Sequence, residues 1–228
     1  MSPERARRVL MAAMETLASG ADLLRDLDAA VGDGDLGLTV AKGAGAVRGA
    51  LGEMQAPDAP GLLAATGKAF SQANPSTMAA LTGAACTSAA RALAGCEALD
   101  REAAVRLVRA AADAVARRGK AEVGDKTVLD PLAASLEALE SSSDVDGYEA
   151  LVRMVEAAAE AVEATAGLVA RRGRPSWVGE RGAGQRDPGA VSYLMFLRAL
   201  QSAWCEAAGP AELPSDSGAA RVYPDGNP

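Results

Sequence analysis

The residues best suited to chemistry are three aspartates in a short stretch that also contains several glycines. Asp28, Asp33 and Asp35 all fall within residues 27–37. Asp33 and Asp35 are two positions apart, so an extended backbone would point both side chains the same way. Converging carboxylates repel one another unless a cation lies between them, and an all-carboxylate set selects a hard divalent cation such as Mg²⁺. The stretch therefore predicts a magnesium site.

Three other readings of this stretch are available. The spacing Gly32-x-Gly34-x-x-Gly37 matches a dinucleotide-binding fingerprint, but no strand is expected before it, and its two aspartates would repel a pyrophosphate. The later ligand positions of an EF-hand and its closing glutamate are missing. A solvated acidic turn, with glycines serving only the backbone geometry, remains open.

Further glycine-rich connectors follow at residues 74–77, 119–126 and 173–189. Ordering glycine is costly in backbone entropy, so such loops should have a compensating role. Ser76 and Thr77 follow a proline at the expected start of a helix, where free amides and the helix dipole favour an anion. This turn is a candidate phosphate-binding site.

Residues 119–127 come close to a nucleotide-binding P-loop but have one residue too many. They also follow an expected helix rather than a strand, which excludes that motif. A purely structural alternative stays open, in which Gly119 ends one helix and Thr127 begins the next.

Composition narrows the range of functions. The chain of 228 residues contains no histidine, so neither a histidine base nor an imidazole metal ligand is available. A net charge of −7 argues against binding to nucleic acid. The three cysteines form no CxxC pair and are expected to be buried thiols in a reducing compartment. We predict a cytoplasmic protein without a signal peptide or a membrane span.

The elements that must position these residues are helices. Apolar side chains recur at helical spacing, aromatic residues make up only 3% of the chain, and no alternating strand pattern is evident. Asp100 and Asp187-Pro188 are typical helix starts. The expected helices cover residues 4–18, 20–30, 38–54, 61–73, 76–95, 100–118, 127–140, 147–171 and 188–208. The sequence predicts an all-α fold in a single domain, residues 1–208, followed by a disordered tail, residues 209–228.

Four motifs together resemble one family. Residues 27–37, 118–127, 172–176 and 179–189 are similar, in order and at compatible spacing, to segments of the dihydroxyacetone kinase L subunit. The similarity runs over roughly residues 5–205. It implies a closed barrel of about eight mostly antiparallel helices with a site for ATP or ADP at one end.

The resemblance assigns roles to individual residues. It makes Asp28, Asp33 and Asp35 the ligands of Mg²⁺, with two ions expected, and gives them and Arg174 the catalytic role; from its position alone, Arg174 could equally be a surface cation. The residues expected to contact the nucleotide are Gly37, Leu38, Thr39, Ser76, Thr77, Met78, Gly119, Val128, Arg174, Asp187, Pro188 and Gly189.

The chain also departs from the family pattern. Leu36 stands where the family has a histidine, and Thr39 where it has an asparagine. The family's glycine-rich phosphate turn is replaced by Asn74-Pro75-Ser76-Thr77-Met78, which is less flexible. These changes leave the expected metal ligands intact but affect the expected phosphate geometry.

Three functions follow from the resemblance. The first is an ATP-dependent kinase subunit that phosphorylates dihydroxyacetone or a related small ketose held by a separate K-type subunit. In the second, bound ADP is a fixed cofactor recharged by a phosphotransferase-system protein. The third is a non-catalytic nucleotide-binding regulator. Phosphoryl transfer requires mainly positioning and charge neutralisation, so a chain without histidine can serve it.

Overall fold

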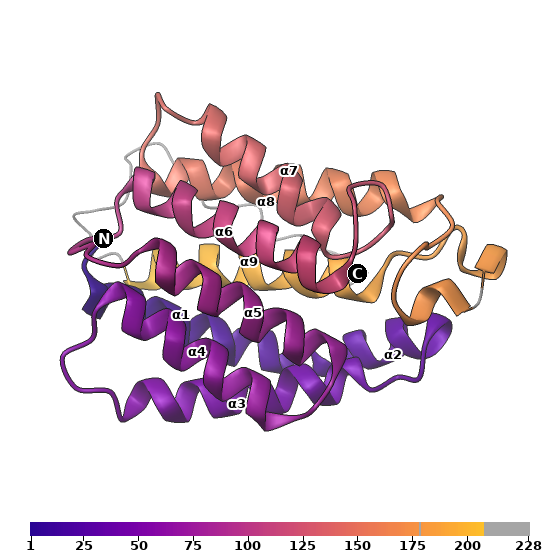
Figure 1. The fold of residues 1–228 in the computed structure, drawn as a ribbon, viewed down its shortest axis with the longest axis horizontal. Coiled ribbons are helices and arrows are strands. Elements are labelled where there is room, and N and C mark those ends of the chain that lie inside the picture. The colour runs from indigo at the N-terminus through magenta and orange to yellow at the C-terminus, as the bar shows by residue number, and fades with distance from the viewer. Residues whose placement is uncertain (178, 208–228) are drawn as a thin grey trace.

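The computed structural model describes residues 1–177 and 179–207, and the described part is entirely helical (Figure 1). The elements are α1 (Pro3–Ser19), α2 (Ala21–Val31), α3 (Leu36–Gly52), α4 (Ala59–Ala73), α5 (Thr77–Ala92), α6 (Arg101–Gly119), α7 (Leu129–Ser141), α8 (Gly147–Ala166), two short 3₁₀ helices η1 (Arg174–Trp177) and η2 (Gly179–Gly182), and α9 (Pro188–Ala207).

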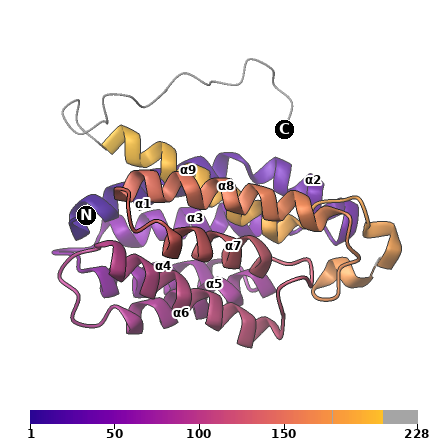
Figure 2. The ribbon, with the colours of Figure 1, turned by 90° about the horizontal axis from the view of Figure 1, so that it is seen from above.

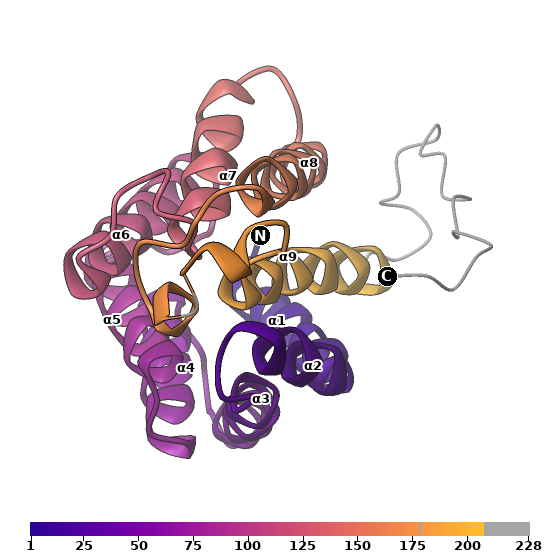
Figure 3. The same cartoon turned by 90° about the vertical axis from the view of Figure 1, so that its right-hand side faces the viewer.

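The long helices lie side by side and alternate in direction (Figures 1 and 3). Each packs against the next in the order α1, α3, α4, α5, α6, α7, α8, α9, and α9 packs back onto α1. The short helix α2 lies outside this order and packs mainly on α3. The prediction of an all-helical single domain is confirmed, whereas closure into a barrel stays a prediction.

Capping residues and small side chains explain why these segments pack as helices. Asp100 accepts a hydrogen bond from the backbone N–H of Ala103, as its position before α6 predicts. Gly67 on α4 and Gly83 on α5 allow the two helices to approach closely, since a Cβ at either position would meet the facing helix at less than 3.0 Å. A sequence rich in alanine and glycine can pack in this way with few aromatic side chains.

The core runs along the whole bundle and lines a partly open cavity of about 650 Å³. Its lining is almost wholly apolar and includes Met78 of α5 and Val128, next to the start of α7. Cys86 also lines the cavity, and burial raises the pKa of its thiol to about 12. Among the described helices, none combines the length and apolar character needed to cross a membrane.

The expected helices match the observed ones except at their ends. The predicted helix 147–171 is too long, because α8 ends at Ala166. The carbonyl groups at this helix end accept hydrogen bonds from the side chain of Lys126 instead of continuing the helical pattern. The 3₁₀ helices η1 and η2 were not expected. The predicted disordered tail, residues 209–228, lies outside the described residues.

Candidate functional site

The predicted site residues gather at one end of the helical bundle. This end carries the α2–α3, α4–α5 and α6–α7 connections and the long segment between α8 and α9 (Figure 3). Figure 2 shows the segment after α8 at the same end as α2. Residues far apart in the sequence are therefore brought to one end of the fold.

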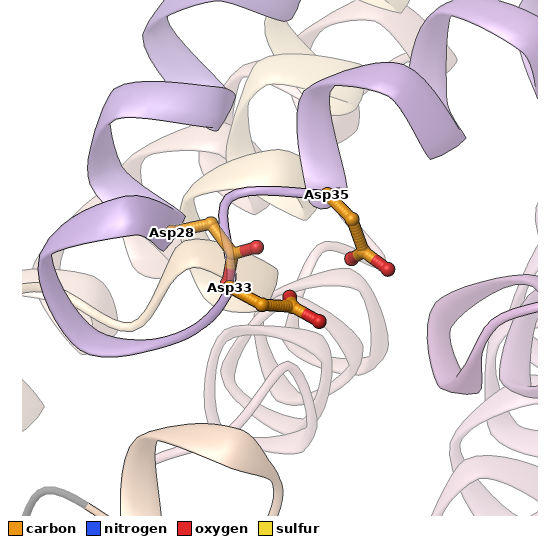
Figure 4. Close-up of side chains that lie close together, drawn as sticks. All are labelled: Asp28, Asp33 and Asp35. Carbon is orange, nitrogen blue, oxygen red and sulfur yellow. The ribbon is translucent and has the colours of Figure 1, made fainter.

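The three aspartates form a compact cluster (Figure 4). Asp28 comes from the last turns of α2, Asp33 from the connecting loop, and Asp35 from the position just before α3. One carboxylate oxygen from each lies within 4.8 Å of the other two. Asp28 is buried, Asp35 is half-buried and Asp33 is exposed, so the cluster opens toward solvent on one side.

The start of α3 supports the negative charge of this cluster. The backbone N–H of Leu36, the first residue of α3, donates a hydrogen bond to Oδ2 of Asp28 at 3.2 Å. The positive end of the α3 dipole thus offsets the unfavourable position of Asp28 near the end of α2. Gly34 has φ +76°, a conformation that favours glycine and turns the chain between Asp33 and Asp35.

This donor set fits Mg²⁺. The ion takes oxygen ligands at about 2.0–2.1 Å, which places opposite ligand atoms roughly 4.2 Å apart. Of three ligands at least two pairs are adjacent, at roughly 2.9 Å, so three oxygens that lie within 4.8 Å of one another reach a common ion once side-chain rotation draws them closer. Because all three donors are carboxylates, the site favours a hard cation over zinc or copper.

The first turn of α3 contains both buried and exposed residues. Gly37 is buried against α2, where a Cβ would overlap the carbonyl oxygen of Ala21. Leu38 is 52% exposed, and Thr39 is 1% exposed. Gly37 is thus required for the packing of α3 on α2, a role that the sequence pattern did not indicate. Contact of Gly37, Leu38 and Thr39 with a nucleotide stays a prediction.

A side-chain hydrogen bond joins the α4–α5 turn to this first turn of α3. Nδ2 of Asn74 donates to Oγ1 of Thr39 at 2.9 Å. Two residues later, Ser76 caps α5 by accepting from the N–H of Ala79 at 3.1 Å. The turn with Ser76 and Thr77 is therefore tied to the helix that follows the aspartates, and Ser76 begins α5 as predicted.

Four predicted residues converge on a second part of the site. At Gly189, near the start of α9, a Cβ would lie 3.1 Å from Oδ2 of Asp187, 3.6 Å from the terminal methyl of Met78 and 3.8 Å from Cβ of Val128. The absence of a side chain at Gly189 lets α5, α7 and α9 approach one another here. Pro188 is the first residue of α9, where its fixed φ suits a helix start. Gly119, at the end of α6, lies close to α5.

Asp187 is a buried carboxylate with a raised pKa. It is 7% exposed and accepts a hydrogen bond from the N–H of Ala190 at 2.7 Å, as a helix-capping residue should. Burial raises the pKa of Asp187 to about 6, with the nearby charge of Asp130 adding to the rise. The positive charge of Lys126 acts in the opposite direction.

Sequence reasoning missed three positioning side chains. Lys126, only 2% exposed, donates to three backbone carbonyls, one at the end of α8 and two in the segment after it. Asp125 is also buried, and Asn74 makes the bond to Thr39. For Asp125 and Lys126 the sequence signals were the near-match of residues 119–127 to a P-loop and the resemblance of residues 118–127 to the family, and neither assigned these side chains a role. Arg174 begins η1, but its side chain lies outside the described part of the structure.

Comparison with known proteins identifies the same family. The DAK2 domain model matches residues 30–202. The chain is 37% identical over 201 residues to L-erythrulose 1-kinase of Mycolicibacterium smegmatis, covering 85% of this chain and 35% of that protein. It is 32% identical over 191 residues to the ADP-binding subunit DhaL of the PEP-dependent dihydroxyacetone kinase of Escherichia coli, covering 82% of this chain and 90% of that subunit.

The fold also matches a solved structure. The dihydroxyacetone kinase from C. freundii, in complex with AMP-PNP and Mg²⁺, superposes with a TM-score of 0.69 at 24% identity, over 89% of this chain and 34% of that one. The chain thus spans about a third of the two longer kinases, and most of the shorter DhaL subunit. The family model and the DhaL match lead to one conclusion: this chain belongs to the DAK2 domain family.

Proposed function

We propose that this chain is the magnesium–nucleotide-binding subunit of a kinase for dihydroxyacetone or a related small ketose. The observation that carries the proposal is the cluster of Asp28, Asp33 and Asp35 at the same end as the wall formed by Met78, Val128 and Gly189. A metal-binding cluster at the same end as a mostly apolar wall suits a ligand with a charged phosphate end and an aromatic base.

Each part of the site has a role in this proposal. The three aspartates would hold Mg²⁺, which neutralises phosphate charge when bound. The backbone N–H groups in the first turn of α5, which follows Ser76, would donate hydrogen bonds to further phosphate oxygens. Met78, Val128 and Gly189 would enclose the base, and Arg174 would contribute positive charge. The described residues contribute binding and orientation, which are the main protein contributions to phosphoryl transfer.

The acceptor ketose and the second subunit are part of the same proposal. Relatives named as erythrulose and dihydroxyacetone kinases support a ketose of three or four carbons. We propose that a separate K-type subunit holds this ketose. The test mixes the chain with a K-type subunit, ATP, Mg²⁺ and dihydroxyacetone, and measures dihydroxyacetone phosphate. Product is expected with the parent chain and not with Asp33→Ala, whereas equal product from both would contradict the role of the cluster.

A second candidate concerns the phosphoryl donor. The chain covers 90% of a subunit that is named as the ADP-binding component of a PEP-dependent kinase. In that alternative, ADP stays bound and a phosphotransferase-system protein recharges it. Denaturing the purified chain and quantifying the released nucleotide separates the two: about one ADP per chain favours the fixed cofactor, and a nucleotide-free chain that binds ATP reversibly favours direct transfer. Nucleotide binding without product in the presence of a K-type subunit would favour the non-catalytic nucleotide-binding regulator.

A further inference from the structure

Lys126 occupies an unusual position for a lysine. Its residue is 2% exposed, and its backbone adopts φ +61°, a left-handed conformation that side chains other than glycine rarely adopt. Such a conformation persists only where surrounding contacts hold it. The same loop offers a comparison, because Lys120 also has a positive φ, of +50°, but is exposed.

The contacts that hold Lys126 are all made with one distant segment. Its Nζ donates to the carbonyl oxygens of Ala166, Leu168 and Gly182, each at 2.8 Å. An ammonium group has three N–H donors, so these three bonds satisfy it completely. Two of the acceptors lie at or just beyond the end of α8, where unpaired carbonyls and the negative end of the helix dipole favour a cation.

The neighbouring residue makes a second tie between the same two segments. The carbonyl oxygen of Asp125 accepts from the N–H of Arg171 at 3.1 Å. The buried carboxylate of Asp125 accepts from the N–H of Glu122 at 3.0 Å and lies 3.5 Å from Nε of Arg172. The arginine side chains are more than half exposed, so their ion pairs contribute little, and the buried lysine is the stronger tie.

The two segments carry different parts of the proposed nucleotide site. Lys126 stands two residues before Val128, and Gly182 stands five residues before Asp187. Asp130 holds the first segment by accepting from the N–H groups of Gly124 and Thr127, at 2.5 and 2.6 Å. The lysine also places a positive charge near the buried carboxylate of Asp187, on which the nearby charge of Asp130 acts in the opposite direction.

We infer that Lys126 is a positioning residue for nucleotide binding: its ammonium group fixes Ala166, Leu168 and Gly182 against the loop before α7. It thereby sets the spacing between Val128 and the Asp187-Pro188-Gly189 turn without contacting the ligand. This inference rests on the proposed function. If loss of the three bonds leaves the segment in its binding conformation about one tenth of the time, the apparent Kd for nucleotide rises about tenfold.

The test compares Lys126→Met with Lys120→Met, the same change at an exposed lysine of the same loop. Titration calorimetry gives the Kd for ADP in the presence of Mg²⁺, and thermal unfolding gives the Tm. We expect the Kd of Lys126→Met to rise about tenfold at a temperature where the variant is folded, and that of Lys120→Met to match the parent. A variant with a lowered Tm and an unchanged Kd would show that Lys126 is only structural, and would overturn the inference.

Hydrogen exchange of the unmodified chain tests the tie without relying on a variant that folds. We expect the N–H groups of Arg171 and Gly184, which bond to Asp125 and Ala166, to be protected in the absence of nucleotide. Exchange at unprotected rates would overturn the inference. If instead these amides are protected but the parent binds no ADP with Mg²⁺, the proposed function fails while the tie itself stands.

Discussion

Asn74 and Thr39, which are 35 residues apart in the sequence, join the α4–α5 turn to the first turn of α3 through a side-chain hydrogen bond of 2.9 Å. Thr39 is almost fully buried, and it lies one helical turn after Asp35. The bond therefore connects the turn that carries Ser76 to the helix that positions the aspartates. It holds the candidate phosphate-binding turn near the candidate metal site.

A double-mutant cycle measures this connection. We expect Asn74→Ala and Thr39→Val each to lower the free energy of unfolding by about 1 kcal/mol, the usual net contribution of one hydrogen bond. The double variant should lose little more than either single variant, with a coupling energy of about 1 kcal/mol. Urea unfolding of the four proteins gives the cycle. Strictly additive losses would mean that the two side chains do not interact in solution.

Two glycines of α3 should respond to alanine in opposite directions. At Gly37 a Cβ would overlap the backbone of α2, so Gly37→Ala should destabilise the fold by about 1–3 kcal/mol. At Gly45, an exposed position in the same helix, a Cβ would meet nothing within 4 Å. Gly45→Ala should therefore stabilise the fold by about 0.5–1 kcal/mol through helix propensity. Thermal unfolding of both variants checks the α2–α3 contact, and a harmless Gly37→Ala would contradict it.

Protonation of Asp187 should make part of the stability depend on pH. Because its pKa is raised from 3.8 to about 6, the folded state holds this proton more tightly than the unfolded state. The contribution is present at low pH and is lost as pH rises through about 6, so ionisation of Asp187 opposes folding at neutral pH.

Asp187→Asn should remove this dependence, because asparagine can still cap α9 but carries no charge. Relative to the parent, the variant should gain about 1.4 kcal/mol of unfolding free energy between pH 5 and pH 8, the equivalent of one pKa unit. Asp22→Asn, a change at an aspartate whose side chain is 86% exposed, serves as the control. Urea unfolding at the two pH values gives the comparison. A difference between parent and Asp187→Asn that does not change with pH would contradict the raised pKa.

Much of the fold could be predicted from the sequence, for physical reasons that particular residues show. Asp100 and Asp187 mark helix starts because their carboxylates accept backbone N–H groups locally, and both do so. The clustering of the three aspartates was also predictable, because Asp33 and Asp35 are close in sequence and Asp28 is one short loop away.

The parts that could not be predicted depend on contacts between distant segments. Helix α8 ends at Ala166, before the C-cap residue Gly167, and the carbonyl oxygen of Ala166 accepts from Lys126, which lies 40 residues earlier in the chain. The tie between Asn74 and Thr39 likewise depends on how α3 and α5 are placed by the rest of the bundle. Helix propensity and local spacing carry no information on such partners, so the sequence pattern extended the helix to residue 171 and assigned no role to Lys126.

The most direct test of the central claim is titration calorimetry of the purified chain with ADP, with and without Mg²⁺. Asp33→Ala is the test variant, because Asp33 is exposed and its loss should leave the fold intact, and Asp22→Ala is the matched control on α2. We predict binding that requires Mg²⁺ in the parent and in Asp22→Ala, and no binding in Asp33→Ala. Equal binding by Asp33→Ala, or binding by the parent without Mg²⁺, would contradict the assignment of the aspartate cluster as a magnesium–nucleotide site.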